Sequence, residues 1–377
     1  MTLGLVESGQ PRALSPDAVA RLTARRLFPI LQAPPGEKEG MADLNKRIDA
    51  FFERGLIEEA QALKENSISR FTDLMGPWKC DFKCPVCYTY GTNGLVLTTE
   101  QTIGAIKQAQ GMGAKVTYWP GKGELTLLKD FWAVMDWQEK DRLPAVVFTN
   151  GSIFHNDRIS HSVLGVDSAG AIAKVTDYAG MHFYIKYWSS EQEKAAEMVG
   201  VKQDSYPYAK YEGKSVPLAL AKLLDSVGTE RVGVEVMVSR QNFEDVMDNV
   251  IPTILELGLY SYIEPIIFSG AAEGQYALAL TPEQNSVLMP VYASGGAFCE
   301  KRQSTELILV GDKLTPGIAI PPLQENGIVD DSGKVRDLFS LFHGRHFRDA
   351  RKIMEKVGCI CRAFAMGDPA TEPLRGA

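Results

Sequence analysis

The sequence predicts an α/β protein: a partial (β/α)6 parallel barrel with a helical N-terminal extension and a small C-terminal α+β cap. Short runs rich in β-branched residues alternate with amphipathic runs from about residue 67 to about residue 290. This alternation is typical of parallel strands joined by crossover helices. It gives six strand–helix units, too few for an eight-fold barrel of ordinary length. The 377 residues are 45% hydrophobic, enough to fill such a core.

The extension, residues 1–66, is expected to be helical. Ser15 fits an N-cap with Pro16 at the first helical position. A second amphipathic run spans about residues 41–64, after a Pro-Pro-Gly break at 34–36.

The barrel is assigned to residues 67–290 and the cap to residues 291–377. Six strands are expected in the barrel, at 69–75, 114–119, 144–150, 181–187, 231–238 and 260–268. Five crossover helices are expected between and after them, at 98–110, 127–138, 168–179, 216–227 and 242–258. A closing helix follows at 281–294, and the cap is expected to contain a hairpin at 305–317 and a helix at 348–358.

Composition excludes several classes of protein. The formal charge of −7 has the wrong sign for a chain that wraps nucleic acid over a broad surface. No apolar run approaches the roughly 20 residues that span a bilayer. The first residues lack the basic and apolar regions of a signal peptide. We therefore expect a cytoplasmic protein without nucleic-acid or membrane partners.

Three of the six cysteines form one cluster directly after the first expected strand. Cys80, Cys84 and Cys87 make a C-x3-C-x2-C run, and the absence of an export signal favours metal or redox chemistry over disulfides. Three such thiolates can each bind a different iron of one [4Fe–4S] cube and leave the fourth iron free. Zinc is the competing metal, but no fourth Cys or His lies within thirty residues on either side.

This cysteine spacing resembles that of the radical S-adenosylmethionine (radical SAM) superfamily. A second segment, Trp-Pro-Gly-Lys-Gly-Glu at 119–124, is similar to the family's Gly-Gly-Glu segment, with Lys122 in place of the first glycine. The resemblance implies that Gly123 and Glu124 hold the methionine amino group of SAM. It covers about residues 67–274 and implies a [4Fe–4S] cluster and SAM as cofactors.

Weaker matches follow in the family's order. The resemblance implies that Ser189 or Ser190 reaches the ribose of SAM and that Arg240, in a Ser-Arg-Gln-Asn run ending at Asn242, pairs with its carboxylate. A helix cap explains the serines and the asparagine equally well, and a solvated arginine explains Arg240. Val86 stands where the family often has an aromatic residue, so Tyr88 is the candidate to pack on the adenine.

Two charged residues lie on expected strands of the barrel. Lys186 is a candidate for the SAM carboxylate or for a substrate, and Glu264 for a substrate contact or as the partner of Lys186.

The remaining cysteines, Cys299, Cys359 and Cys361, lie in the expected cap. Their layout resembles a twitch or SPASM-like cap, which implies an auxiliary [4Fe–4S] cluster whose fourth ligand position is open or held by a residue other than cysteine. Two alternatives stay open: one thiol returns a hydrogen atom to a product radical, or the thiols are inert.

The resemblance implies an oxidoreductase that reductively cleaves SAM to a 5′-deoxyadenosyl radical, which takes a hydrogen atom from the substrate. We expect a small polar metabolite (a sugar, aminocyclitol or nucleoside), a net oxidation assisted by the auxiliary cluster, and a flavodoxin- or ferredoxin-type reductant. The first alternative is a maturase that modifies a peptide or protein side chain. The alternative of another class is a non-catalytic iron–sulfur carrier or scaffold.

Overall fold

A computed structural model of the chain describes residues 13–26, 28, 70–74, 79–88, 96–121, 123–268, 270–293, 306–310, 313–315, 326–357 and 369–374. Its centre is a sheet with strand order β10-β9-β1-β2-β3-β4-β7-β8. All six expected barrel strands are present and neighbouring ones pair in parallel, which confirms the predicted partial barrel. They are β1 (Arg70–Leu74), β2 (Thr117–Trp119), β3 (Ala145–Thr149), β4 (Met181–Lys186), β7 (Val232–Val238) and β8 (Tyr260–Pro265).

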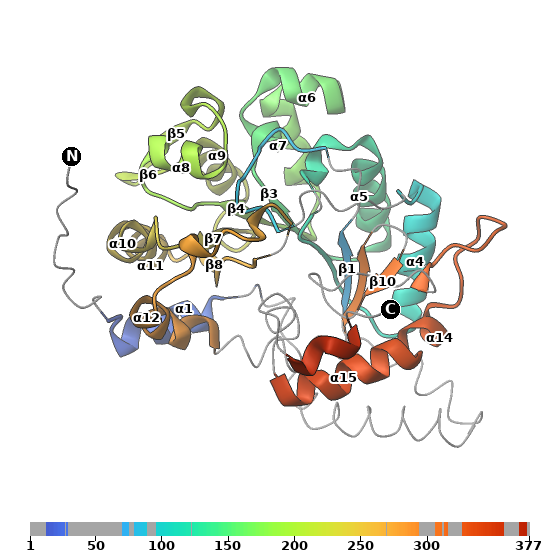
Figure 1. Cartoon of the computed structure of the whole chain (residues 1–377). Helices are drawn as coiled ribbons and strands as arrows, with labels where there is room; N and C mark the ends of the chain where they lie inside the picture. Colours follow the sequence, from blue (N-terminus) through green and yellow to red (C-terminus); the bar gives the residue numbers. More distant parts are fainter. Residues whose placement is uncertain are drawn as a thin grey trace.

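Helices cover the outside of this sheet (Figure 1). The expected crossover helices are confirmed as α4 (Thr99–Gly111), α5 (Lys129–Asp141), α7 (Ser168–Asp177), α9 (Leu218–Val227) and the continuous run α10 (Phe243–Asp245), η6 (Val246–Val250) and α11 (Ile251–Leu257). Helix α4 begins at a capping box formed by Thr98 and Gln101. The strand periodicity did not predict α6 (Asp157–Leu164) or the hairpin of β5 (Tyr208–Tyr211) and β6 (Lys214–Pro217). Helix α8 (Gln192–Met198) follows the two serines, where the capping alternative for Ser189 and Ser190 implied a helix.

Alternate residues of each strand face two different cores. Outward side chains such as Val147, Phe183 and Val234 belong to the large apolar core shared with the helices. Inward side chains of the central strands form a second core rich in aromatic rings, which includes Phe148 and Tyr184. Side chains therefore fill the barrel interior near the middle of the strands. We expect any ligand site of the barrel to lie at the strand ends.

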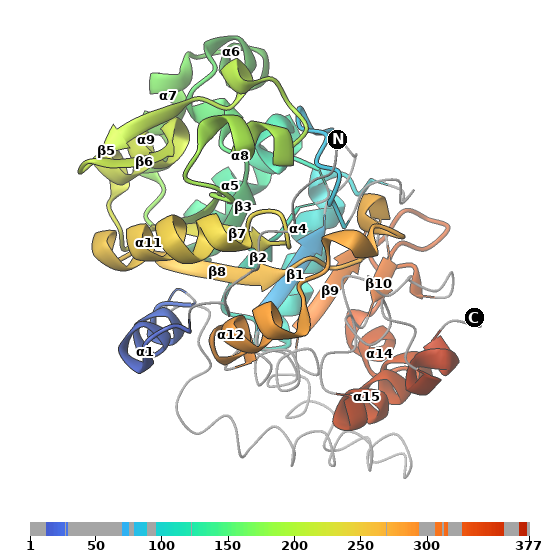
Figure 2. The same ribbon diagram turned by 60° about the vertical axis from the view of Figure 1, so that its left-hand side comes forward.

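The described part of the N-terminal extension, residues 13–26 and 28, packs against the start of β8. Helix α1 (Pro16–Ala24) is capped by Ser15 as predicted, and it lies beside α12 (Pro282–Ala293) in both views (Figures 1 and 2). Beyond it the backbone oxygen of Arg25 accepts from Ser261 N at 2.9 Å. The Phe28 ring packs 4.6 Å from the Tyr260 ring, centroid to centroid. The expected second helix, residues 41–64, lies outside the described residues.

The expected C-terminal hairpin joins the barrel sheet rather than standing apart from it. Strand β9 (Glu306–Val310) pairs in parallel with β1, and β10 (Lys313–Thr315) pairs antiparallel with β9 (Figure 2). The boundary at residue 290 stays a prediction, although this pairing continues one sheet across it. Helices α14 (Leu338–Phe342) and α15 (Arg345–Val357) follow. Cys299, Cys359 and Cys361 lie outside the described residues, and within the described part no helix combines the length and apolarity of a bilayer span.

Candidate cofactor site at the carboxyl ends of the strands

The three clustered cysteines lie on the loop of residues 79–88, which follows β1 at the carboxyl edge of the sheet. Neighbouring loops hold this cysteine loop through its backbone. Lys79 O accepts from Glu124 N at 2.9 Å, Lys83 N donates to Val199 O at 3.2 Å, and Cys87 O accepts from Ala271 N at 2.9 Å. The segments after β2, β4 and β8 therefore all fix the position of the thiols.

Two glycines make this close packing possible. Gly200 has a φ of +68°, and a Cβ there would lie 2.2 Å from Lys83 O. Gly270 has a φ of +61°, and a Cβ there would lie 2.6 Å from Tyr88 O. Left-handed backbone and absent side chains are both needed at these positions, so only glycine fits. The sequence offered no signal that paired these glycines with the cysteine loop.

The three cysteines of this loop differ in their exposure. Cys80 is exposed, while Cys84 and Cys87 are partly buried. Although the Cys80 residue has exposed surface, the protein packed around its thiol and the Glu124 carboxylate raise its pKa to about 12. Burial raises the pKa of Cys84 to about 12, against the opposing effect of the Lys186 ammonium. At neutral pH these two thiols keep their protons until a metal displaces them, because only the thiolate ligates. Among the described residues, no group of three or more His, Cys, Asp or Glu side chains is gathered tightly enough to hold a single ion.

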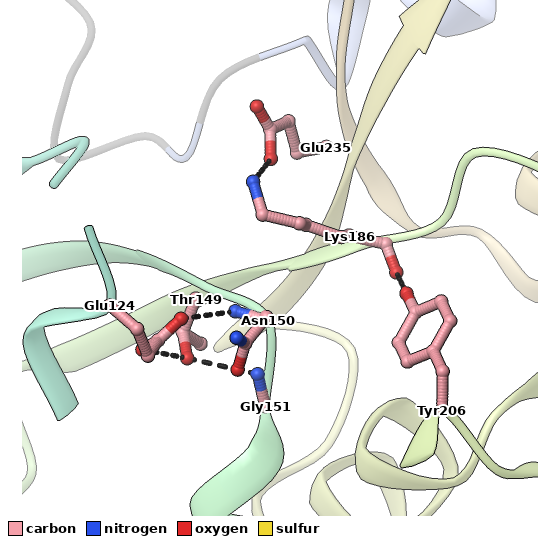
Figure 3. Close-up of polar contacts among 7 residues, drawn as sticks. All are labelled: Glu124, Thr149, Asn150, Gly151, Lys186, Tyr206 and Glu235. Atoms are coloured by element: carbon pink, nitrogen blue, oxygen red, sulfur yellow. Dashed lines mark hydrogen bonds and ion pairs between the residues drawn. The ribbon is translucent and has the colours of Figure 1, made fainter. Parts of the chain in front are cut away.

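Glu124 is buried, and hydrogen bonds from the protein surround its carboxylate. It accepts from Thr126 Oγ1 at 2.7 Å. It also accepts from Thr149 Oγ1 at 2.6 Å and from Asn150 N at 2.6 Å (Figure 3). Burial raises the pKa of Glu124, and these hydrogen bonds oppose the shift. Glu124 thus joins the end of β2 to the end of β3, and its predicted contact with the SAM amine stays a prediction. Gly123 precedes it with a φ of +92°.

Asp81, inside the cysteine loop, is a site residue that the sequence reasoning missed. Its carboxylate accepts from Asn150 Nδ2 at 2.8 Å and from the hydroxyl of Ser152. These contacts fasten the loop to the turn after β3. An acidic residue between two of the clustered cysteines was the available signal, but its partners are about seventy residues away in sequence.

Ser189 and Ser190, the serines predicted near the SAM ribose, form a tight polar cluster with Asp245. Ser189 Oγ donates to Asp245 Oδ2 at 2.6 Å, and Ser190 Oγ donates to Asp245 Oδ1 at 2.5 Å. Ser189 also accepts from Glu191 N at 3.1 Å, in a local turn just before α8. The N-cap of α8 is Glu191 and that helix has no side-chain cap hydrogen bond, so neither serine caps it. The sequence reasoning did not include Asp245.

Asn242 and Arg240 lie just beyond β7. The buried Asn242 side chain donates to Trp188 O at 2.8 Å and accepts from Ser239 N at 2.7 Å, so it ties the ends of β4 and β7 together. Arg240 is exposed and its Nε donates to Ala279 O at 3.0 Å. Asn242 stands at the N-cap position of α10, but its side chain makes no cap hydrogen bond to that helix, so the capping interpretation holds for its position alone. The contacts of both residues with SAM stay predictions.

Glu264 is not the ion-pair partner of Lys186 that the sequence suggested. Lys186 Nζ lies 2.9 Å from Glu235 Oε2, whereas Glu264 Oε1 lies 3.4 Å from Arg26 Nη2. Register explains the correction, because Lys186 stands opposite Glu235 on the adjacent strand and Glu264 is one strand further away. Tyr88 lies close enough to this pair that Glu235 adds to the burial that raises its pKa. Its packing on an adenine stays a prediction.

Replacing Asp245 with asparagine is expected to lower the free energy of unfolding by about 1.5–3 kcal/mol at neutral pH, because charge-assisted hydrogen bonds are lost. Burial alone would raise the pKa of Asp245, but the hydrogen bonds from Ser189 and Ser190 outweigh it and the pKa is lowered. The stabilisation is present above the unfolded carboxyl pKa of about 3.9 and disappears as the pH falls through the lower folded pKa.

Denaturant unfolding at several pH values measures this difference. The exposed Asp248, three residues further on, provides the matched Asp248→Asn control. A gap between wild type and Asp245→Asn that is independent of pH from 7 to 3 would contradict the assigned role of the charge.

No protein-family model and no curated protein matches this sequence. Solved structures do match it. Streptococcus suis SuiB bound to precursor peptide SuiA aligns with a TM-score of 0.56 at 10% identity, over 88% of this chain and 76% of that one. SuiB bound to S-adenosylmethionine gives 0.56 at 12% identity, over 92% and 87%. Native anSMEcpe with bound AdoMet gives 0.50 at 12% identity, over 76% and 84%.

These likenesses show the fold. The chain has the fold of radical SAM enzymes, as its resemblance to that superfamily predicted.

Proposed function

We propose that the protein is a radical SAM enzyme that binds a [4Fe–4S] cluster through Cys80, Cys84 and Cys87. The placement of these three thiols supports this best: they lie on one loop after β1, at the carboxyl edge of a partial parallel barrel. Barrels of this kind carry their chemistry at that edge. The SuiB and anSMEcpe structures that share the fold have bound S-adenosylmethionine.

The described residues fit such a cluster. When bound, the cluster supplies the one electron that cleaves SAM, and the adenosyl fragment then takes a hydrogen atom from the substrate. Cys80, Cys84 and Cys87 would hold the cluster as its three protein ligands, with SAM as the expected further ligand. The cysteine loop packs on an apolar cluster that includes Phe82, Val86 and Trp188, which keeps water from this side of the site.

An unpaired donor lies in the same apolar cluster. Within the described residues, the buried Trp188 Nε1 has no hydrogen-bond partner. A buried donor of this kind suits an acceptor on a bound group.

For SAM itself we propose the residues that the resemblance implies. Gly123 and Glu124 lie after β2, Ser189 and Ser190 after β4, and Arg240 and Asn242 after β7. All of them therefore share the edge that holds the cysteine loop. Tyr88, Lys186 and Glu264 are the candidates for the adenine and the substrate.

We propose a peptide or protein as the substrate, in place of the small polar metabolite expected from the sequence. The likeness to SuiB bound to precursor peptide SuiA supports this choice. So does the rim of the site, where Tyr276 is 55% exposed and its ring lies 5.3 Å from that of Phe268. Both follow β8, on the segment whose Gly270 abuts the cysteine loop. Exposed aromatic surface beside a reactive centre suits a peptide chain better than a sugar.

Anaerobic reconstitution tests the proposed function. We expect the protein to take up iron and sulfide and to convert SAM to 5′-deoxyadenosine when dithionite is added. Protein that binds one zinc and no sulfide, or that holds a cluster but leaves SAM intact, would contradict the proposal.

Deuterium transfer separates the two substrate classes. Pools of perdeuterated peptides and of perdeuterated sugars and nucleosides are each incubated with the reconstituted protein and SAM. We expect deuterium in 5′-deoxyadenosine from the peptide pool alone. Transfer from the sugar and nucleoside pool would restore the metabolite hypothesis.

Changing Cys299, Cys359 and Cys361 together to alanine is expected to leave SAM cleavage intact but to remove about four irons per chain, because these thiols are proposed to hold an auxiliary cube. Iron analysis of the reconstituted variant beside wild type measures this. An unchanged iron content would reject the second cluster and leave a hydrogen-donor thiol or inert thiols.

A further inference from the structure

The ion pair between Lys186 and Glu235 lies at the end of the barrel that holds the cysteine loop. Lys186 is the last residue of β4, and Glu235 is its register partner on β7. Their side chains are 22% and 12% exposed, and Nζ and Oε2 are 2.9 Å apart (Figure 3). The pair is thus a mostly buried pair of opposite charges, which solvent screens only weakly.

Packing joins this pair to the cysteine loop. The Phe82 ring, between the first two cysteines, meets the Tyr206 ring edge-on at 5.3 Å, and the Tyr206 hydroxyl donates to Lys186 O (Figure 3). On the other side Lys186 Nζ lies 5.1 Å from the centre of the Trp188 ring. That ring shares one apolar cluster with Phe82 and Cys84.

The electrostatics agree with this geometry. Burial alone would lower the pKa of the Lys186 ammonium, but the Glu235 carboxylate outweighs it and the pKa is raised. The pair therefore holds one positive and one negative charge beside the residues that pack on the cysteine loop.

We propose that Lys186 and Glu235 set the reduction potential of the cluster held by Cys80, Cys84 and Cys87. Reduction adds one negative charge to the cluster. A nearby ammonium stabilises the reduced form, and a nearby carboxylate destabilises it. Both are positioning residues in this role, because they act through the cluster. The proposal rests on the proposed function, since it needs a cluster on these thiols.

Opposite shifts from the two partners are the expected signature. Lys186→Gln leaves an unpaired carboxylate, and we expect the ratio of reduced to oxidised cluster at a given applied potential to fall about tenfold, which is about 59 mV for one electron. Glu235→Gln leaves an unpaired ammonium, and we expect a rise of similar size. The double variant restores neutrality and is expected to stay within about twofold of wild type.

The experiment is a redox titration of the reconstituted full chain without SAM, followed by the electron paramagnetic resonance signal of the reduced cluster. Lys174 and Asp136 form a matched ion pair at 2.8 Å between the outer helices α7 and α5. Lys174→Gln therefore makes the same charge change away from the cluster and is expected to shift the ratio by less than twofold. Lys186→Arg keeps the charge and is expected to behave likewise.

Shifts of the two single variants in the same direction, or ratios within twofold of wild type in both, would overturn the inference. Iron content is measured in every sample. If Lys186→Gln does not hold the cluster, the Glu235→Gln variant decides alone. A rise in its ratio of reduced to oxidised cluster supports the inference, and no rise overturns it. Wild-type protein without any cluster would instead refute the proposed function, so the two failures are distinguishable.

Discussion

Replacing any one of Cys80, Cys84 and Cys87 with alanine is expected to abolish the conversion of SAM to 5′-deoxyadenosine. The three thiols would hold the cluster together, so a chain that lacks one of them would bind it weakly and would not supply the electron that cleaves SAM. We expect activity below the detection limit and a loss of up to about four irons per chain. Chromatography of 5′-deoxyadenosine after dithionite addition, together with iron analysis, measures both.

Lys83→Ala is the matched control for these variants. Lys83 lies in the same loop with an exposed side chain, and the hydrogen bond it makes to Val199 uses its backbone nitrogen, which alanine retains. We expect wild-type iron content and SAM cleavage in this variant. Retained cleavage in any of the three cysteine variants would refute the assignment of the cluster ligands.

Substitution of Gly200 by alanine is expected to be the most damaging change outside the cysteines themselves. The added Cβ would lie 2.2 Å from Lys83 O, a backbone atom that cannot rotate away. The cysteine loop must shift as a whole, in addition to the strain of a left-handed alanine, which costs about 1–2 kcal/mol. We expect a loss of at least about 3 kcal/mol in unfolding free energy and an iron content several-fold below wild type.

A substitution at Gly213 separates the backbone strain from the contact with the cysteine loop. It lies in the turn of the β5–β6 hairpin with a φ of +80°, and a Cβ there would meet nothing within 4 Å. Gly213→Ala therefore carries the backbone strain alone, and we expect it to lose only about 1–2 kcal/mol and to bind iron normally. Equal effects of the two alanine substitutions on iron uptake would show that the contact with the cysteine loop is unimportant.

The sequence predicted the barrel well because its strands and helices are locally encoded. Runs such as 231–238 are β-branched and buried on both sides, and such runs are recognisable without knowledge of their neighbours. The hairpin at β5 and β6 was missed because its short strands carry mixed polar residues. The parallel pairing of β9 with β1 was also missed, because pairing partners far apart in sequence leave no local pattern.

The residues of the candidate site also fall into two groups: those in short motifs and those that only the fold brings together. The cysteine spacing and the Gly-Glu step are short motifs, so both could be found from one sequence. The partner of Lys186 could not, since it depends on which strand lies next to β4 and in what register. Asp245 was overlooked for a similar reason, as its hydroxyl partners come from the end of another strand.

From its sequence alone this protein is a parallel α/β chain with a set of three thiols suited to an iron–sulfur cube, because strand periodicity and ligand spacing are both properties of short segments. Only the tertiary structure decided what surrounds those thiols: two glycines that admit the cysteine loop, an aspartate that fastens it and a lysine–glutamate pair beneath it. Each of these contacts joins residues distant in the chain, and only the folded backbone brings them within contact distance.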